Sequence, residues 1–128
     1  MRYLGIDYGT KKIGVAISDE EGSFAFPHGV IPSDTAALDA IAKICSEKGV
    51  GAVVLGRSRN YAGQENPVMA NVKNFEKALR ERTSLPIEYE DEVLTTAQAA
   101  RDVGKNENTD AAAAALILGN FLSRLHAN

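Results

Sequence analysis

The chain has 128 residues, of which 45% are hydrophobic and 24% charged, and these values predict one soluble globular domain spanning residues 1–128. Its net charge of −3 at pH 7 excludes a generally basic nucleic-acid-binding protein, because such binding rests on Lys and Arg that neutralise phosphates; any nucleic-acid site must be a local patch. The single cysteine, Cys45, excludes an internal disulfide, and the lack of an apolar run long enough to span a membrane predicts a cytoplasmic protein that binds no membrane.

The N-terminal part of the chain has the pattern of an antiparallel sheet. Alternating apolar residues predict strands at residues 2–7 and 13–18, and the short Gly-containing turn between them predicts a hairpin. A third strand is predicted at residues 24–30, where Pro27 favours a position at the edge of the sheet.

The pattern then changes to alternating helices and strands. A helix is predicted over residues 34–48, with Ser33 as its N-cap and Gly49 as its stop. The nearly continuous apolar run at residues 50–55 is typical of a strand buried on both faces. A polar loop follows over residues 56–65.

Asn66-Pro67 begins the next predicted helix, with Pro at its first position. Its apolar face comprises Val68, Val72, Phe75 and Leu79.

The C-terminal part adds one strand and two helices. Residues 86–89 read as a short strand that ends in an acidic run, and Thr95 or Thr96 caps a short helix to about residue 103. The last helix is predicted from Asp110 to about Leu125, with Thr109 as its cap. Its predicted core-facing positions are Ala114, Ile117, Leu118, Phe121 and Leu125. The whole pattern predicts an α/β fold: a five-stranded mixed sheet, three antiparallel strands and then two parallel ones, flanked by helices.

Three acidic residues follow or begin these elements where an α/β sheet gathers its functional groups. Asp7 ends the first strand, Glu92 follows the last strand, and Asp110 begins the last helix. Carboxylates held close together repel unless a cation is present, and oxygen ligands suit Mg²⁺ or Mn²⁺. Each acid also has a simpler explanation, since Asp7 could shape a turn, Glu92 could be solvated and Asp110 could favour a helix N-terminus. Asp91 is an alternative to Glu92, and periodicity does not choose between them.

If the acids meet, the chemistry is that of phosphodiester hydrolysis. A pair of divalent ions about 4 Å apart activates a water and stabilises the leaving oxygen. Asp7 would be the bridging ligand, and Thr10, Lys11 and Lys12 would meet the substrate phosphate. Gly9 would permit the tight turn beside Asp7.

Four segments resemble the YqgF family, also called the RuvX-like family of Holliday junction resolvases, within the ribonuclease H-like superfamily. They are "LGIDYGTKKIGVAISD", "GRSRNYAGQE", "DEVLTT" and "TDAAAAALIL", and they occur in the family's order and approximate spacing over nearly the whole chain.

The resemblance implies a ribonuclease H-like fold and a metal-dependent nuclease with Mg²⁺ or Mn²⁺ as cofactor. The family's acidic triad corresponds to Asp7, Glu92 and Asp110, which selects Glu92 over Asp91. The implied substrate is nucleic acid, with 5′-end maturation of precursor 16S rRNA expected first and four-way DNA as the alternative. The chain is expected to act as a monomer or a homodimer.

Two departures from the family's pattern concern positive charge. The family usually has an apolar residue and Pro after Gly56, where this chain has Arg57-Ser58, and it usually has Arg at the position of Val93. An Arg beside a metal site can hold phosphate with two hydrogen bonds, so its loss matters. Arg57 and Arg59 are therefore predicted to supply nucleic-acid contacts from the neighbouring loop.

The sequence is also compatible with two other functions. Asp7-Tyr8-Gly9-Thr10 also resembles the phosphate loop of actin-like and sugar-kinase ATPases, although those enzymes close two such domains on a nucleotide. The altered residues at 57, 58 and 93 would also suit a non-catalytic nucleic-acid-binding module of the same fold, whereas the three retained acids argue against it.

Overall fold

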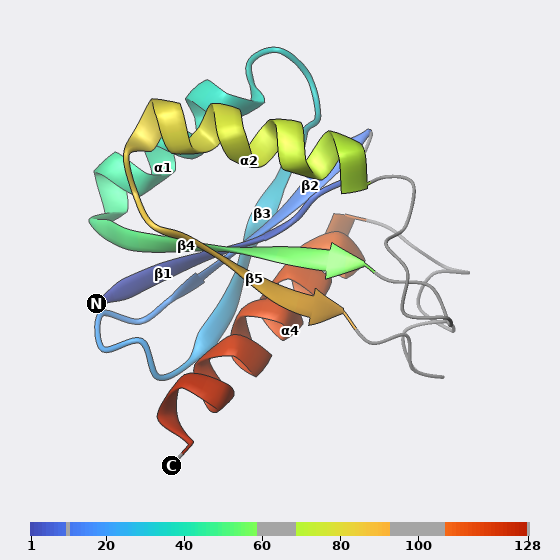
Figure 1. Ribbon diagram of the computed structural model, residues 1–128. Helices are drawn as coiled ribbons and strands as arrows, with labels where there is room; N and C mark the ends of the chain where they lie inside the picture. Colours follow the sequence, from blue (N-terminus) through green and yellow to red (C-terminus); the bar gives the residue numbers. More distant parts are fainter. Residues whose placement is uncertain (10, 59–68, 93–106, 128) are drawn as a thin grey trace.

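The protein forms a five-stranded mixed sheet with helices on both faces, as seen in a computed structural model (Figure 1). The structure describes residues 1–9, 11–58, 69–92 and 107–127. The strand order is β3-β2-β1-β4-β5. The strands are β1 (Arg2–Asp7), β2 (Lys12–Ser18), β3 (Ala25–Pro32), β4 (Val50–Ser58) and β5 (Ile87–Glu92).

The sheet changes from antiparallel to parallel pairing at β1. β2 pairs antiparallel with both β1 and β3, whereas β4 pairs parallel with both β1 and β5. The predicted mixed sheet is therefore confirmed, and Pro27 lies on the edge strand β3, as expected. Because β1, β4 and β5 run parallel, their carboxyl ends meet at one edge of the sheet, which we call the strand-end edge.

In the described part of the chain, three helices cover the sheet. Helices α1 (Ala37–Lys48) and α2 (Met69–Thr83) lie on one face, and α4 (Glu107–His126) lies on the other (Figure 1). Each face has its own buried core. The α1/α2 core includes Leu4, Ile6, Ile13, Val15, Ile41, Cys45, Val53, Leu55, Val72 and Leu79. The smaller α4 core includes Ala16, Val54, Ala114, Ile117, Leu118 and Leu122.

Strand alternation explains how a single strand contributes side chains to both cores. Successive side chains on a strand point to opposite faces, and Val53 and Leu55 enter the α1/α2 core while Val54 enters the α4 core. This burial on both sides accounts for the unbroken apolar run in β4. None of the described helices is long and apolar enough to cross a membrane.

Several predicted boundaries were wrong. Helix α1 begins at Ala37, and Ser33 is not its N-cap: the Asp34 carboxylate accepts a hydrogen bond from the backbone N–H of Ala36 at 2.9 Å, which forms a turn before the helix. The C-terminal prediction was right, since Gly49 adopts the left-handed conformation with φ 67° and donates its N–H to the carbonyl of Cys45.

The two parallel strands are longer than the apolar runs suggested. β4 continues through Arg57 and Ser58, and β5 includes the acidic run to Glu92, because backbone pairing between the two strands extends past their apolar residues. Helix α4 includes Thr109, so Thr109 is not its cap. The predicted start at Asn66-Pro67 and the predicted short helix to residue 103 lie outside the described residues.

Candidate active site

Asp7 ends β1 at the strand-end edge, on the face covered by α4. Its partner across the antiparallel pair is Gly14 of β2. The face follows from alternation, because Leu4 and Ile6 enter the α1/α2 core whereas Tyr3 packs against Phe121 of α4 with ring centroids 5.7 Å apart. Asp7 itself is half-buried.

Gly14 allows Asp110, near the beginning of α4, to lie at the same edge of the sheet as Asp7. A Cβ at position 14 would overlap the carbonyl oxygen of Asp110, so only glycine permits the first turns of α4 to approach β2 so closely. Asp110 is 7% exposed. Asp7, at the end of a strand, and Asp110, in the first turns of a helix, therefore both lie beside Gly14 at this edge.

A second glycine holds the middle of α4 against β1. A Cβ at Gly5 would lie 2.7 Å from the Cβ of Leu118 and 3.1 Å from the carbonyl oxygen of Ala114. Gly5 and Gly14 lie on the α4 face of neighbouring strands. Together they set the depth of α4 on the sheet and hence the position of Asp110.

Strand register places Asp91, the alternative to Glu92, on the opposite face of the sheet from Asp7. Asp91 lies on the α1/α2 face, where its Oδ1 accepts a hydrogen bond from Nε of Arg57 at 2.6 Å. Glu90, one residue earlier, lies on the α4 face in an ion pair with Arg124 of α4. Glu92 is the last residue of β5, and its backbone pairs with Ser58 of β4. Asp91 therefore lies on the face opposite Asp7, and the choice of Glu92 as the partner of Asp7 stays a prediction.

Arg57 belongs to a network on the opposite face of the sheet from Asp7. Its guanidinium lies over the ring of Tyr89, 5.5 Å from the centroid. The Tyr89 hydroxyl donates to Oε1 of Glu76 at 2.5 Å, and Arg80 binds the other carboxylate oxygen of Glu76 at 2.7 Å.

Those contacts explain two pKa shifts. The hydrogen bond from Tyr89, and then the Arg80 guanidinium, lower the pKa of Glu76. Burial, and then the bond to Glu76, raise the pKa of Tyr89.

The predicted phosphate contacts divide between the two faces. Lys11 lies in the turn that follows Asp7 and Lys12 begins β2, and both are exposed. The Lys11 carbonyl accepts a hydrogen bond from the Ser33 N–H at 2.9 Å. Arg57 lies on the α1/α2 face. Thr10 and Arg59 lie outside the described residues, as does Val93.

The donor set suits a hard divalent cation, because carboxylate oxygens are the ligands that Mg²⁺ and Mn²⁺ prefer. Asp7 and Asp110 supply two such groups at one edge. Among the side chains that the structure describes, no three acidic, histidine or cysteine groups are grouped closely enough to hold one ion, and the Glu92 side chain is outside that set.

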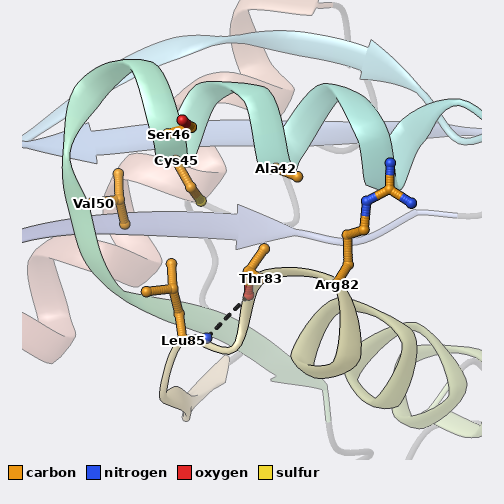
Figure 2. A pocket seen from close by; sticks show the side chains of 7 residues that line it. All are labelled: Ala42, Cys45, Ser46, Val50, Arg82, Thr83 and Leu85. Carbon is orange, nitrogen blue, oxygen red and sulfur yellow. Dashed lines mark hydrogen bonds between the residues drawn. The ribbon is translucent and has the colours of Figure 1, made fainter.

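One hollow lies elsewhere, at the opposite end of the parallel strands from the acids. It has a volume of about 270 Å³ and lies between α1 and the end of α2 (Figure 2). Thr83, one of its lining residues, accepts a hydrogen bond from the Leu85 N–H at 3.2 Å. Cys45 also lines it, and burial raises the pKa of this thiol to about 11, so the thiolate form that a nucleophile needs is disfavoured. This hollow is separate from the acids.

Sequence reasoning missed Gly14 and Glu90. Gly14 stands in an apolar strand pattern, and an isolated glycine there is a recognised signal of close backbone approach. The sequence pattern shows Glu90 only as part of the acidic run that ends the last strand, yet Glu90 is 9% exposed. Its burial depends on Arg124, a residue 34 positions away that no local pattern connects to it.

The family model described as "RuvX: Holliday junction resolvase" matches residues 1–124. The chain belongs to the RuvX family. A relative from Limosilactobacillus fermentum, named "Putative pre-16S rRNA nuclease", is 38% identical over 95% of this chain and 93% of its own length.

Solved structures show the ribonuclease H-like fold of this RuvX-family chain. RuvC of Thermus thermophilus, in a complex with a Holliday junction, superposes with a TM-score of 0.64 at 14% identity, covering 98% of this chain and 96% of RuvC. The fowlpox virus Holliday junction resolvase gives a TM-score of 0.56 at 15% identity, covering 97% and 99% of the two chains. The expected family and fold class are thereby confirmed.

Proposed function

We propose that this chain is a divalent-metal-dependent nuclease that hydrolyses phosphodiester bonds in the 5′-end maturation of precursor 16S rRNA, a role carried out in the cytoplasm. The observation that carries the proposal is the convergence of Asp7 and Asp110 at the strand-end edge, made possible by Gly14, in a chain of the RuvX family. Glu92 ends β5 at the same strand-end edge, which supports a third carboxylate there.

Asp7, Glu92 and Asp110 are the residues that would hold Mg²⁺ or Mn²⁺. Bound ions of this kind supply an activated water and neutralise the charge that develops on the leaving oxygen. The protein's own contribution is positioning: Asp7 is held by β-sheet pairing on a central strand, and Asp110 by the packing of α4 on Gly5 and Gly14. Lys11 and Lys12 attract the phosphate backbone beside Asp7.

Precursor 16S rRNA is proposed as the substrate because the curated relatives are named for it. Four-way DNA is the second candidate, supported by the description of the matching family model and by the fold shared with RuvC. Paired cuts in a junction would require a homodimer, whereas a single cut in RNA would suit a monomer.

The test is cleavage of a labelled RNA that carries an unprocessed 16S 5′ extension, in Mg²⁺ or Mn²⁺, with a labelled four-way DNA junction in parallel. The wild-type chain is compared with Asp7→Asn, which keeps the side-chain shape and removes the charge. We expect RNA cleavage by the wild type and a loss of at least about a hundredfold in the variant, since the metal site carries the reaction.

The outcomes separate the candidate functions. Cleavage of the junction alone would move the substrate to four-way DNA and would predict a dimer in solution. Binding of both nucleic acids without cleavage of either would overturn the nuclease and favour a non-catalytic binding module. Cleavage that persists unchanged in Asp7→Asn would exclude Asp7 as a ligand.

A further inference from the structure

Glu90 is a buried carboxylate that the proposed reaction does not use. It lies on β5, and its side chain is 11% exposed. In the described part of the chain, the buried charged residues are Glu90 and Asp110. A buried carboxylate is costly unless a partner offsets its lost hydration, and here the partner is the guanidinium of Arg124, in the last turn of α4.

This ion pair joins α4 to β5, whereas apolar contacts join α4 to the other strands. Among the described residues, the α4 core takes side chains from four strands, namely Tyr3 of β1, Ala16 of β2, Ala25 of β3 and Val54 of β4, and none from β5. Apolar packing therefore sets the position of α4 on those four strands. The ion pair between Glu90 and Arg124 sets its position relative to β5.

Arg124 is also connected to β1 through two aromatic rings. Its guanidinium lies over the ring of Phe121, 5.8 Å from the centroid. Phe121 in turn packs on Tyr3 of β1 with ring centroids 5.7 Å apart. The ion pair is therefore continuous with the packing of α4 on β1, the strand that ends in Asp7.

Glu90 lies at the same level of the sheet as Asp7. Ile6 of β1 pairs with Leu55 of β4, so Asp7 and Gly56 come one position later on these two strands. Gly56 in turn pairs with Glu90 of β5. The strand between Asp7 and Glu90 thus has a glycine at this level, and two strand spacings separate the two backbones by about 10 Å.

We propose that Glu90 and Arg124 are positioning residues of the candidate metal site. Their ion pair fixes the end of β5, and with it Glu92, relative to α4 and β1. Those two elements supply Asp110 and Asp7. The proposal rests on the proposed function, since it requires that these acids hold a metal. Groups that orient metal ligands from outside the coordination sphere typically change metal affinity by about 10–100-fold when they are removed.

The effect of charge alone on metal binding can be separated from positioning. Glu90→Gln weakens metal binding in either case, because it removes a negative charge as well as the ion pair. Arg124→Gln distinguishes the two, because it leaves the charge of Glu90 without its counter-charge. Charge alone would then tighten the binding of a cation, whereas loss of the positioning contact weakens it. Arg124→Lys keeps the charge and can keep the ion pair.

The experiment measures the Kd of Mn²⁺ by calorimetric titration of the wild type, Glu90→Gln, Arg124→Gln and Arg124→Lys. The matched control is Arg82→Gln, which removes the same charge and breaks the ion pair between α2 and Asp39 of α1, on the other face of the sheet (Figure 1). Urea denaturation checks that every variant remains folded. Binding of a labelled single-stranded RNA in EDTA is measured on the same samples.

We expect Glu90→Gln and Arg124→Gln each to raise the Kd of Mn²⁺ at least about tenfold. Arg124→Lys should stay within about threefold of the wild type, because the ammonium keeps the charge without the planar fork. The control should stay within about twofold, because solvent and salt screen a distant exposed charge.

Three results would overturn the positioning role. They are unchanged or tighter Mn²⁺ binding in Arg124→Gln, an equal loss in Arg82→Gln, and weaker RNA binding in Arg124→Gln with an unchanged Kd for Mn²⁺. The last result would make Arg124 a nucleic-acid contact instead.

Failure of the proposed function would give a different result. If the wild type does not bind Mn²⁺, the metal-dependent nuclease is contradicted and the positioning role with it. If the wild type binds Mn²⁺ and cleaves nucleic acid while both Gln variants keep its Kd, only the positioning role is contradicted.

Discussion

At the scale of single residues, Gly14 determines whether the two described acids can meet. It lies opposite Asp7 across the hairpin and directly beneath the Asp110 carbonyl. A methyl group at position 14 would overlap a backbone atom of α4. The overlap could not be relieved by a side-chain rotation, so the helix itself would have to move. The candidate site thus depends on a residue that has no functional group.

Gly14→Ala should therefore lower both stability and cleavage. We expect a loss of about 1–3 kcal/mol in the free energy of unfolding, typical of overpacking, measured by urea denaturation. Gly29→Ala is the matched control, since a Cβ there has no neighbour within 4 Å, and it should change stability by less than about 0.5 kcal/mol. Equal effects at the two positions would contradict the close approach of α4.

Tyr89 and Glu76 form a hydrogen-bonded pair whose contribution to the stability of the fold depends on pH. Because the pKa of Glu76 is lowered in the folded state, the bond to the Tyr89 hydroxyl contributes stability above the ordinary Glu pKa, and this contribution is lost as the pH falls through the lowered value. Tyr89→Phe should cost about 1 kcal/mol at pH 7 and less below about pH 4.

Urea denaturation across that pH range measures the effect of Tyr89→Phe. Tyr3→Phe is a suitable control, because that ring packs on Phe121 and should give a difference that does not depend on pH. A Tyr89→Phe deficit that stays constant from pH 7 to pH 3 would rule out the carboxylate as the reason.

At the scale of elements, α4 has a buried stripe that differs from the predicted one at its C-terminal end. Leu125 was predicted to face the core and is 50% exposed, whereas Leu122 is 1% exposed. Both positions fit a helical period with Leu118, so the sequence pattern allowed either. The direction in which α4 crosses the sheet selects Leu122.

Leu122→Ala should destabilise the protein by about 3 kcal/mol, since it removes a buried side chain and leaves a cavity. Leu125→Ala makes the same chemical change three residues later on the same helix and should cost no more than about 0.5 kcal/mol. Chemical denaturation of the two variants provides the comparison. A larger loss at Leu125 would show that α4 is rotated about its axis relative to this structure.

At the scale of the whole molecule, metal binding should increase the stability of the folded protein. A cation that binds only the folded chain raises the free energy of unfolding by about 2.7 kcal/mol when its concentration is a hundred times its Kd. We expect Mn²⁺ to raise the melting temperature of the wild type and EDTA to reverse the rise. In Asp7→Asn and Asp110→Asn the rise should be absent or much smaller, and an equal rise in these variants would exclude the acids as ligands.

Much of this organisation could be predicted from the sequence by itself. The strands, the change from antiparallel to parallel order and the apolar runs of β1, β2 and β4 all follow from short-range periodicity, because a residue's face on a strand or helix depends on its immediate neighbours. Asp7 and Asp110 could be selected as candidates for the same reason, since each adjoins a recognisable element.

The tertiary structure decided what those elements bring together. Gly14 beneath Asp110, Glu90 bound to Arg124, and Arg57 turned to the face opposite Asp7 all depend on strand register or on the depth at which α4 packs. Contacts of this kind join residues far apart in the chain, and local periodicity contains no information about them. The sequence therefore determined which residues could take part in chemistry, whereas long-range packing decided which of them meet.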